Sequence, residues 1–126
     1  MPRRSRPALI IVEPNPGEAL SVRKLAVETA KFNVLTAHSA EEGIETLDRF
    51  PNADGIVIHG KLPDRDQVER HAKKNGASVP LIFLQTHNGE YSALADHTVS
   101  SHAPDELIKL LQSLFGDPRP STSSPD

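Results

Sequence analysis

Five short segments of strand character recur along the chain. Three are uninterrupted apolar runs, 33–37 mixes apolar and polar residues, and 97–101 has a single large apolar residue. Uninterrupted apolar runs of this length are typical of strands that are buried on both faces of a parallel sheet. The pattern predicts strands at residues 8–12, 33–37, 55–58, 80–84 and 97–101.

Apolar residues at helical spacing fill the segments between these runs. Residues 17–31 carry one such face, and a more polar helix is expected at 66–74. Between them, Ser39 and Glu42 form a capping box that begins a helix. That helix has an apolar face of Ile44, Leu47 and Phe50.

The last two predicted helices differ in the strength of their signals. The segment 88–95 has room only for a short fourth helix. The final helix has Pro104 in its first turn, and Gly116 and Pro118 end it. Its apolar face consists of Leu107, Leu110, Leu111 and Leu114.

Strands that alternate with helices predict an α/β fold with three layers, in which right-handed crossovers cover both faces of a parallel sheet. We expect a flexible basic arm at 1–6, one domain at 7–116, and a disordered tail at 117–126 that is rich in proline and serine.

Composition narrows the functional class. The 126 residues suffice for one domain, and 37% hydrophobic with 25% charged residues suits a globular protein. A net charge of -3 gives no general attraction to nucleic acid, and the absence of cysteine excludes disulfides and thiolate zinc sites. The early apolar run is too short for a signal peptide or a membrane span, so we expect a cytoplasmic protein without nucleic-acid or membrane partners.

Four sequence motifs accompany this order of elements. They are Val12-Glu13-Pro14-Asn15-Pro16 after the first strand, Asp54 to His59 through the third, Leu62-Pro63-Asp64 just beyond it, and Pro104-Asp105-Glu106-Leu107 at the start of the last helix. Over residues 7–115 the pattern resembles the CheY-like receiver domain of two-component response regulators. The resemblance implies a flavodoxin-like sandwich with the strand order 2-1-3-4-5.

The residues that carry phosphorylation in that family are replaced here. The resemblance places His59 at the position of the phosphate-accepting aspartate. The acidic pair that holds Mg²⁺ reads Glu13-Pro14, which leaves one carboxylate, although this small hard cation requires oxygen ligands. Proline supplies neither a side-chain ligand nor an amide donor.

Three further family positions are also changed. The hydroxyl residue at the end of the fourth strand corresponds to Gln85, or to Thr86 if the register shifts by one. The phosphate-binding lysine corresponds to Ser101, which carries no positive charge. The aromatic residue of the fifth strand corresponds to Thr98.

Because these departures fall on one site while the apolar pattern is intact, the sequence resembles a degenerate receiver, or pseudo-receiver. We expect no enzymatic activity and no cofactor. The expected role is phosphorylation-independent binding of a signalling protein, or self-association. Ile108 and Phe115 lie off the leucine face of the last helix and are candidates for an apolar interface.

Two other functions remain open from the sequence. His59, His87 and His102 follow strands three, four and five, where open α/β sheets bind ligands, and could form a metal or small-ligand site with Glu13. As separate loop histidines they would have no such role. Alternatively, a phosphoryl group could be accepted by His59 itself, or by Asp54 or Asp64.

Overall fold

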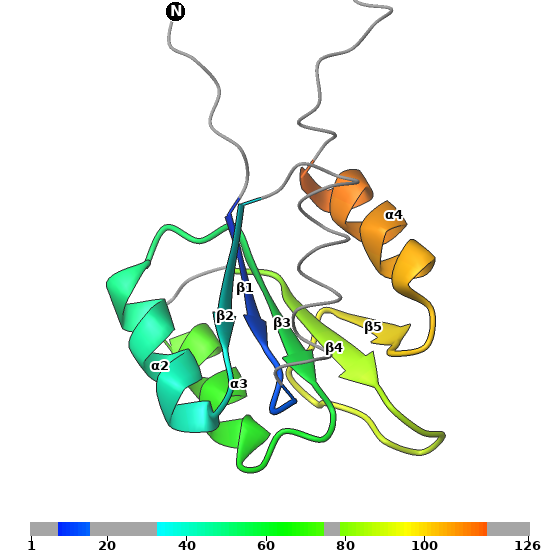
Figure 1. Cartoon of the computed structure of the whole chain (residues 1–126), viewed down its shortest axis with the longest axis horizontal. Helices are drawn as coiled ribbons and strands as arrows, with labels where there is room; N and C mark the ends of the chain where they lie inside the picture. The colour runs from blue at the N-terminus through cyan, green and yellow to red at the C-terminus, as the bar shows by residue number, and fades with distance from the viewer. Residues whose placement is uncertain (1–7, 16–32, 75–78, 116–126) are drawn as a thin grey trace, which may run out of the picture.

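Parallel pairing of the apolar runs forms the centre of the molecule. The computed structural model describes residues 8–15, 33–74 and 79–115. These residues contain one five-stranded sheet (Figure 1). Its strands are β1 (Ala8–Val12), β2 (Asn33–Ala37), β3 (Gly55–His59), β4 (Leu81–Gln85) and β5 (His97–Ser100).

The strand order is β2-β1-β3-β4-β5, and every neighbouring pair is parallel. Central β1 pairs on both sides, with Val12 opposite Ala37 of β2 and Ile58 of β3. The predicted α/β class and strand order are therefore confirmed. The strand boundaries differ from the predicted ones by no more than one residue.

Three helices cover the two faces of the sheet. On one face lie α2 (Ala40–Arg49) and α3 (Arg65–Lys74), and on the other lies α4 (Pro104–Phe115) (Figure 1). The described part of the chain thus has three layers. The predicted helix at 17–31, the arm at 1–6 and the tail at 117–126 lie outside the described residues.

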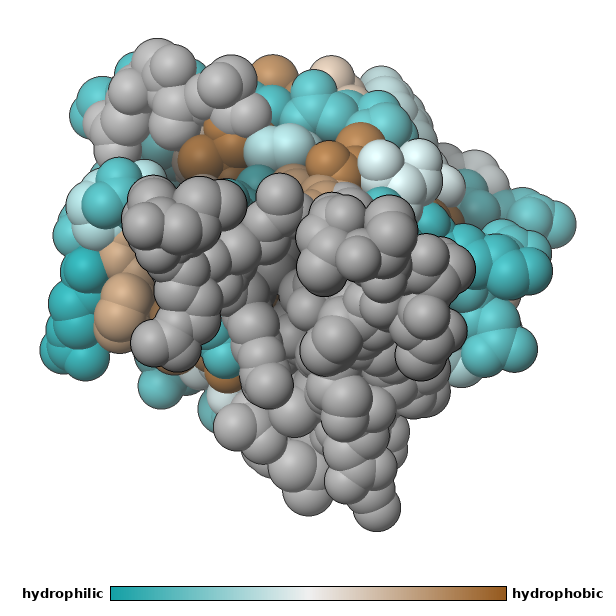
Figure 2. Space-filling view, turned by 90° about the horizontal axis from the view of Figure 1, so that it is seen from above, coloured by the Kyte–Doolittle hydropathy of each residue, from teal (hydrophilic) through white to brown (hydrophobic). Residues whose placement is uncertain are grey.

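Side-chain alternation along the strands divides the core in two. In β1, Leu9 and Ile11 pack toward α4, whereas Ile10 and Val12 pack toward α2 and α3. All four are almost fully buried because helices cover both faces. In the view from above, the described residues at the rim are mostly hydrophilic, and hydrophobic ones show between them (Figure 2).

The start of α2 follows the predicted cap, with one difference. The Ser39 hydroxyl accepts a hydrogen bond from the Glu42 N–H at 3.0 Å. The Glu42 carboxylate accepts from the N–H of His38, one residue earlier than a capping box requires. The prediction for Phe50 is wrong, because this residue is the C-cap and its side chain is exposed.

The predicted fourth helix is absent. Residues 86–96 connect β4 to β5 through turns, and Gly89 adopts φ +88°, a conformation that interrupts a right-handed helix. Tertiary hydrogen bonds hold the segment instead. For example, Asp96 accepts from the Leu81 N–H at 2.8 Å.

The two interface candidates on the last helix pack inward in the structure. Ile108 is buried in the core cluster beneath α4, and Phe115 is partly buried against the same cluster. A methyl group added to Gly55 would lie 2.8 Å from the Phe115 ring, so the end of α4 packs directly on the start of β3. Both side chains therefore contribute to the core.

No helix among residues 8–15, 33–74 and 79–115 has the length and apolar character needed to cross a bilayer.

Burial of Ile108 leads to a stability prediction. Ile108→Ala should lower the free energy of unfolding by about 2–5 kcal/mol, because it leaves a cavity under α4. The neighbouring Lys109 is exposed, and Lys109→Ala should stay within about 0.5 kcal/mol of the parent protein. Urea unfolding measures both. A small loss of stability accompanied by a loss of self-association would instead place Ile108 at an interface.

Candidate functional site

A pocket of about 310 Å³ lies at the edge of the sheet where the strands end. Parallel strands bring their carboxyl ends to one edge, so the residues following β1, β3, β4 and β5 meet there. The described residues that line it are Glu13, Pro14, Asn15, His59, Lys61, Thr86, Ser101 and His102.

A buried pair of Glu13 and His59 forms the floor of this pocket. His59 Nε2 lies 3.2 Å from Glu13 Oε2. Only 2% of Glu13 and 7% of His59 is exposed to solvent. Burial removes the competing water, so this polar contact is stronger than a similar one at the surface.

The tautomer of His59 follows from its second contact. The backbone N–H of Lys61 donates to His59 Nδ1 at 3.2 Å, which makes that nitrogen an acceptor. The ring proton therefore lies on Nε2 and is donated to Glu13. Since both ring nitrogens are engaged, His59 could accept a phosphoryl group or a metal only by breaking one of these contacts.

The Mg²⁺ site implied by the receiver resemblance does not fit these residues. Glu13 uses Oε2 for His59 and Oε1 for the N–H of Asn15, at 2.9 Å. Pro14 has no ligating side chain, and the imidazole of His59 is a poor ligand for a cation that prefers oxygen. The imidazole N–H of His59 donates a hydrogen bond to the Glu13 carboxylate, the group that would otherwise face the cation.

The end of β4 corrects one predicted site residue. Thr86 lines the pocket and Gln85 does not. The Gln85 side-chain amide instead donates to the backbone oxygen of Glu90 at 2.8 Å. Ser101 does line the pocket, and its N–H donates to the Gln85 carbonyl. The hydroxyl residue of this edge is therefore Thr86, in the alternative register considered above.

Glu90 is a residue that sequence reasoning missed. Its Oε1 accepts from the Thr86 N–H at 2.6 Å and from the Thr86 hydroxyl at 2.8 Å. Its Oε2 lies 3.5 Å from Nδ1 of His87. Gly60 makes room for this carboxylate, because a methyl group there would lie 2.1 Å from Oε1. A single glutamate in a polar loop gives no sequence signal for such a role.

Opposing effects act on the Glu90 carboxyl. Burial raises its pKa, but the two hydrogen bonds from Thr86 and the positive charges of His87 and Arg65 lower it more. The resulting pKa lies below the ordinary value of 4.5, so the carboxylate is ionised at neutral pH.

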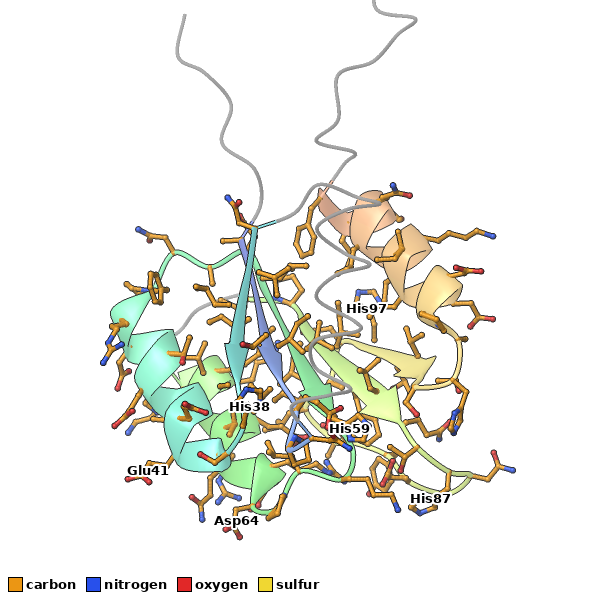
Figure 3. The ribbon with its side chains drawn as sticks, in the orientation of Figure 1. His38, Glu41, His59, Asp64, His87 and His97 are labelled. Carbon is orange, nitrogen blue, oxygen red and sulfur yellow. The ribbon has the colours of Figure 1, made fainter. Side chains whose placement is uncertain are left out.

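The predicted trio of histidines is not gathered at one point. His59 and His102 line the pocket, but the His87 side chain is 62% exposed and lies on the loop after β4 (Figure 3). Within the described ranges, no three His, Cys, Asp or Glu side chains are close enough to share a metal ion. A neighbour not predicted is His38, whose Nδ1 lies 3.0 Å from the backbone oxygen of Glu13.

The two alternative aspartates lie outside the pocket. Asp54 precedes β3, at the opposite edge of the sheet, and accepts from the Ala8 N–H at 2.8 Å. Asp64 is an exposed turn residue with φ 58° in the loop between β3 and α3 (Figure 3). Thr98, the position of the family's aromatic residue, is exposed in β5.

Solved structures share this fold, whereas no family model and no curated protein matches the sequence. One match is a chain from the crystal structure of the complex between the P1 domain of CheA3 and CheY6 from R. sphaeroides. It aligns with a TM-score of 0.74 and 22% identity, and the alignment covers 88% of this chain and 98% of that chain. The signal receiver domain of a putative LuxO repressor from Vibrio parahaemolyticus aligns with a TM-score of 0.75 and 16% identity, covering 90% and 93%.

A third match carries a metal in its own structure. The receiver domain of a sensor histidine kinase from Pseudomonas aeruginosa, with magnesium coordinated in the active-site cleft, gives a TM-score of 0.75 and 20% identity, covering 89% of this chain and 99% of that one. At these identities the similarity establishes the receiver-domain fold.

The contact between Gly60 and Glu90 can be tested by a double-mutant cycle. Gly60→Ala should displace the Glu90 carboxylate and lower the free energy of unfolding by about 1–3 kcal/mol. In a Glu90→Ala background the same change should cost clearly less, with a coupling energy of about 0.5–3 kcal/mol. Urea unfolding of the four proteins measures this coupling. Equal costs in both backgrounds would show that the two positions do not interact.

The lowered pKa of Glu90 predicts a pH dependence. Because the folded-state pKa lies below 4.5, ionisation of Glu90 stabilises the fold above that pH and loses this effect as the pH falls toward the folded-state value. Glu90→Gln should therefore lower the free energy of unfolding by about 1–3 kcal/mol at neutral pH. The difference from the parent protein should shrink below about pH 4.5. Urea unfolding across this range measures it, and a constant difference would contradict the prediction.

Proposed function

We propose that this chain is a receiver-like module of two-component signalling that binds partner proteins without being phosphorylated. It is a non-enzymatic domain that works in the cytoplasm. Its partner is another signalling protein or a second copy of the chain. The receiver-domain fold supports the signalling class, and one structural neighbour comes from a complex of the P1 domain of CheA3 with CheY6.

The buried pair of Glu13 and His59 is the observation that carries this proposal. An imidazole at the end of β3 cannot form the acyl phosphate that an aspartate forms. Its N–H also satisfies Glu13, the remaining carboxylate of the acidic pair. The buried Glu13 carboxylate therefore has hydrogen-bond donors within the protein, from His59 and from the N–H of Asn15.

The segment after β5 lacks the positive charge that the resemblance expects there. Ser101, the first residue after β5, stands where the resemblance expects a lysine. A hydroxyl group can donate one hydrogen bond, but it cannot compensate the charge of a phosphoryl group. Among the described residues of the lining, Lys61 on the β3–α3 loop is the one lysine, and its side chain is exposed.

Glu90 supports a fixed conformation of the same edge. Its carboxylate engages both the N–H and the hydroxyl of Thr86, so the hydroxyl group of the pocket already has an anionic partner. A surface held by internal contacts needs no chemical signal to reach its binding conformation. We infer that partner binding is constitutive.

Phosphorylation chemistry tests the proposal directly. Acetyl phosphate with Mg²⁺ should leave the intact mass unchanged, and beryllofluoride should leave the amide NMR spectrum unchanged. A receiver domain with its aspartate serves as the positive control. An increase in mass by one phosphoryl group would refute the proposal.

His59→Asp extends the same experiment. This variant should also remain unlabelled, because its new carboxylate would face Glu13 without a metal site and with Ser101 in place of the lysine that the resemblance expects after β5. Circular dichroism should establish that the variant is folded. Efficient labelling of the folded variant would show that the rest of the site is competent and that only the acceptor has been lost.

A further inference from the structure

The face covered by α3 has a groove outside the pocket described above. It occupies about 550 Å³, where the loop between β4 and β5 approaches the outer surface of the helix. The loop contributes Leu94 to the lining. The helix contributes Gln67, Arg70, His71, Lys73 and Lys74.

The lining of this groove is cationic, although the whole chain has a net charge of -3. Arg70 pairs with Asp66 at 3.0 Å, but both side chains are largely exposed. An exposed pair of this kind contributes little, so a partner carboxylate can compete for the guanidinium. Lys74 is exposed at the end of the helix.

Two of the lining side chains, Lys73 and His71, already pair with carboxylates outside the groove. Lys73 pairs with Asp96 at 2.5 Å, and His71 pairs with Asp48 of α2 at 2.8 Å. These contacts fix the position of α3 against its neighbours. Arg70 and Lys74 are therefore the cations best placed to meet a ligand.

The loop adds an apolar side chain to this basic surface. Leu94 lines the groove and is 38% exposed, and Tyr91 of the same loop is 71% exposed. An exposed leucine side chain in a groove is typical of interaction surfaces. Both loop residues lie in the segment where the predicted helix is absent.

The loop is held rigidly behind these side chains. Arg65 donates to the Tyr91 carbonyl at 3.0 Å and stacks over the buried ring of Phe83, with 4.6 Å to its centroid. Asp96 fixes the other end of the loop to the N–H of Leu81. A surface that is already ordered loses less conformational entropy on binding.

We propose that this groove binds an acidic, extended segment of a partner protein. Carboxylates of the segment contact Arg70 and Lys74, and an apolar side chain packs against Leu94. The inference rests on the proposed function as an interaction module, and it names the surface and the chemistry of the partner. The negative charge of the rest of the chain disfavours a long polyanion such as nucleic acid.

A fluorescent short peptide of alternating glutamate and leucine is the probe, and its lysine and leucine counterpart is the control ligand. The full chain should bind the acidic peptide and not the basic control peptide, and added salt should weaken this binding. Arg70→Glu with Lys74→Glu should weaken it by roughly fivefold or more. Lys109→Glu reverses an exposed charge on α4, at the opposite face, and should have little effect.

A matched apolar pair tests the loop. Leu94→Ser should weaken binding, whereas Phe50→Ser, at another exposed apolar residue, should not. Unchanged melting temperatures should accompany all these variants. In NMR titrations, the amide shifts should change at residues 65–74 and 91–95.

Three results would overturn the inference. The first is that the acidic peptide does not bind. The second is that Lys109→Glu weakens peptide binding as much as the double reversal of Arg70 and Lys74 does. The third is that a labelled oligonucleotide binds more tightly than the peptide and that the double reversal abolishes its binding. Failure of the proposed function gives a different result, namely labelling by acetyl phosphate. If the peptide does not bind and the protein stays unlabelled by acetyl phosphate, the inference about this groove is wrong, whereas the proposed function still holds.

Discussion

Parallel pairing of β1 on both of its sides is the constraint on which the rest of the structure depends. A strand flanked by β2 and β3 in the same direction requires crossover connections. In the described residues the crossover helices α2 and α3 cover one face of the sheet, and the final helix α4 covers the other. The same pairing brings every carboxyl end to one edge. Residues that are far apart in the sequence, such as Glu13 and Ser101, therefore line one pocket.

At that edge, the chemistry is set by one buried contact between an imidazole and a carboxylate. Glu13 and His59 are each almost fully buried, so each requires a polar partner, and each provides it for the other. Lys61 completes the arrangement through its backbone N–H. The result is a pocket floor whose buried polar groups hydrogen-bond to one another and to the neighbouring backbone.

The loop between β4 and β5 shows how tertiary contacts replace a missing helix. Glu90 ties the loop to Thr86 above Gly60, and Arg65 ties it to α3 and Phe83. These contacts order the backbone without regular hydrogen bonding along the segment. Leu94 of this loop lines the groove beside α3.

The sequence alone determined the α/β class, the strands and the Ser39 cap, because apolar periodicity and capping are local properties. It also placed Glu13 and His59 at the site, because each lies at the end of a predicted strand and that position can be read from the local sequence. Only the tertiary structure decided that Thr86 rather than Gln85 lines the pocket, that Glu90 engages it, and that Ile108 and Phe115 pack inward. Register, burial and long-range hydrogen bonds depend on which elements meet in space, and no local pattern encodes that.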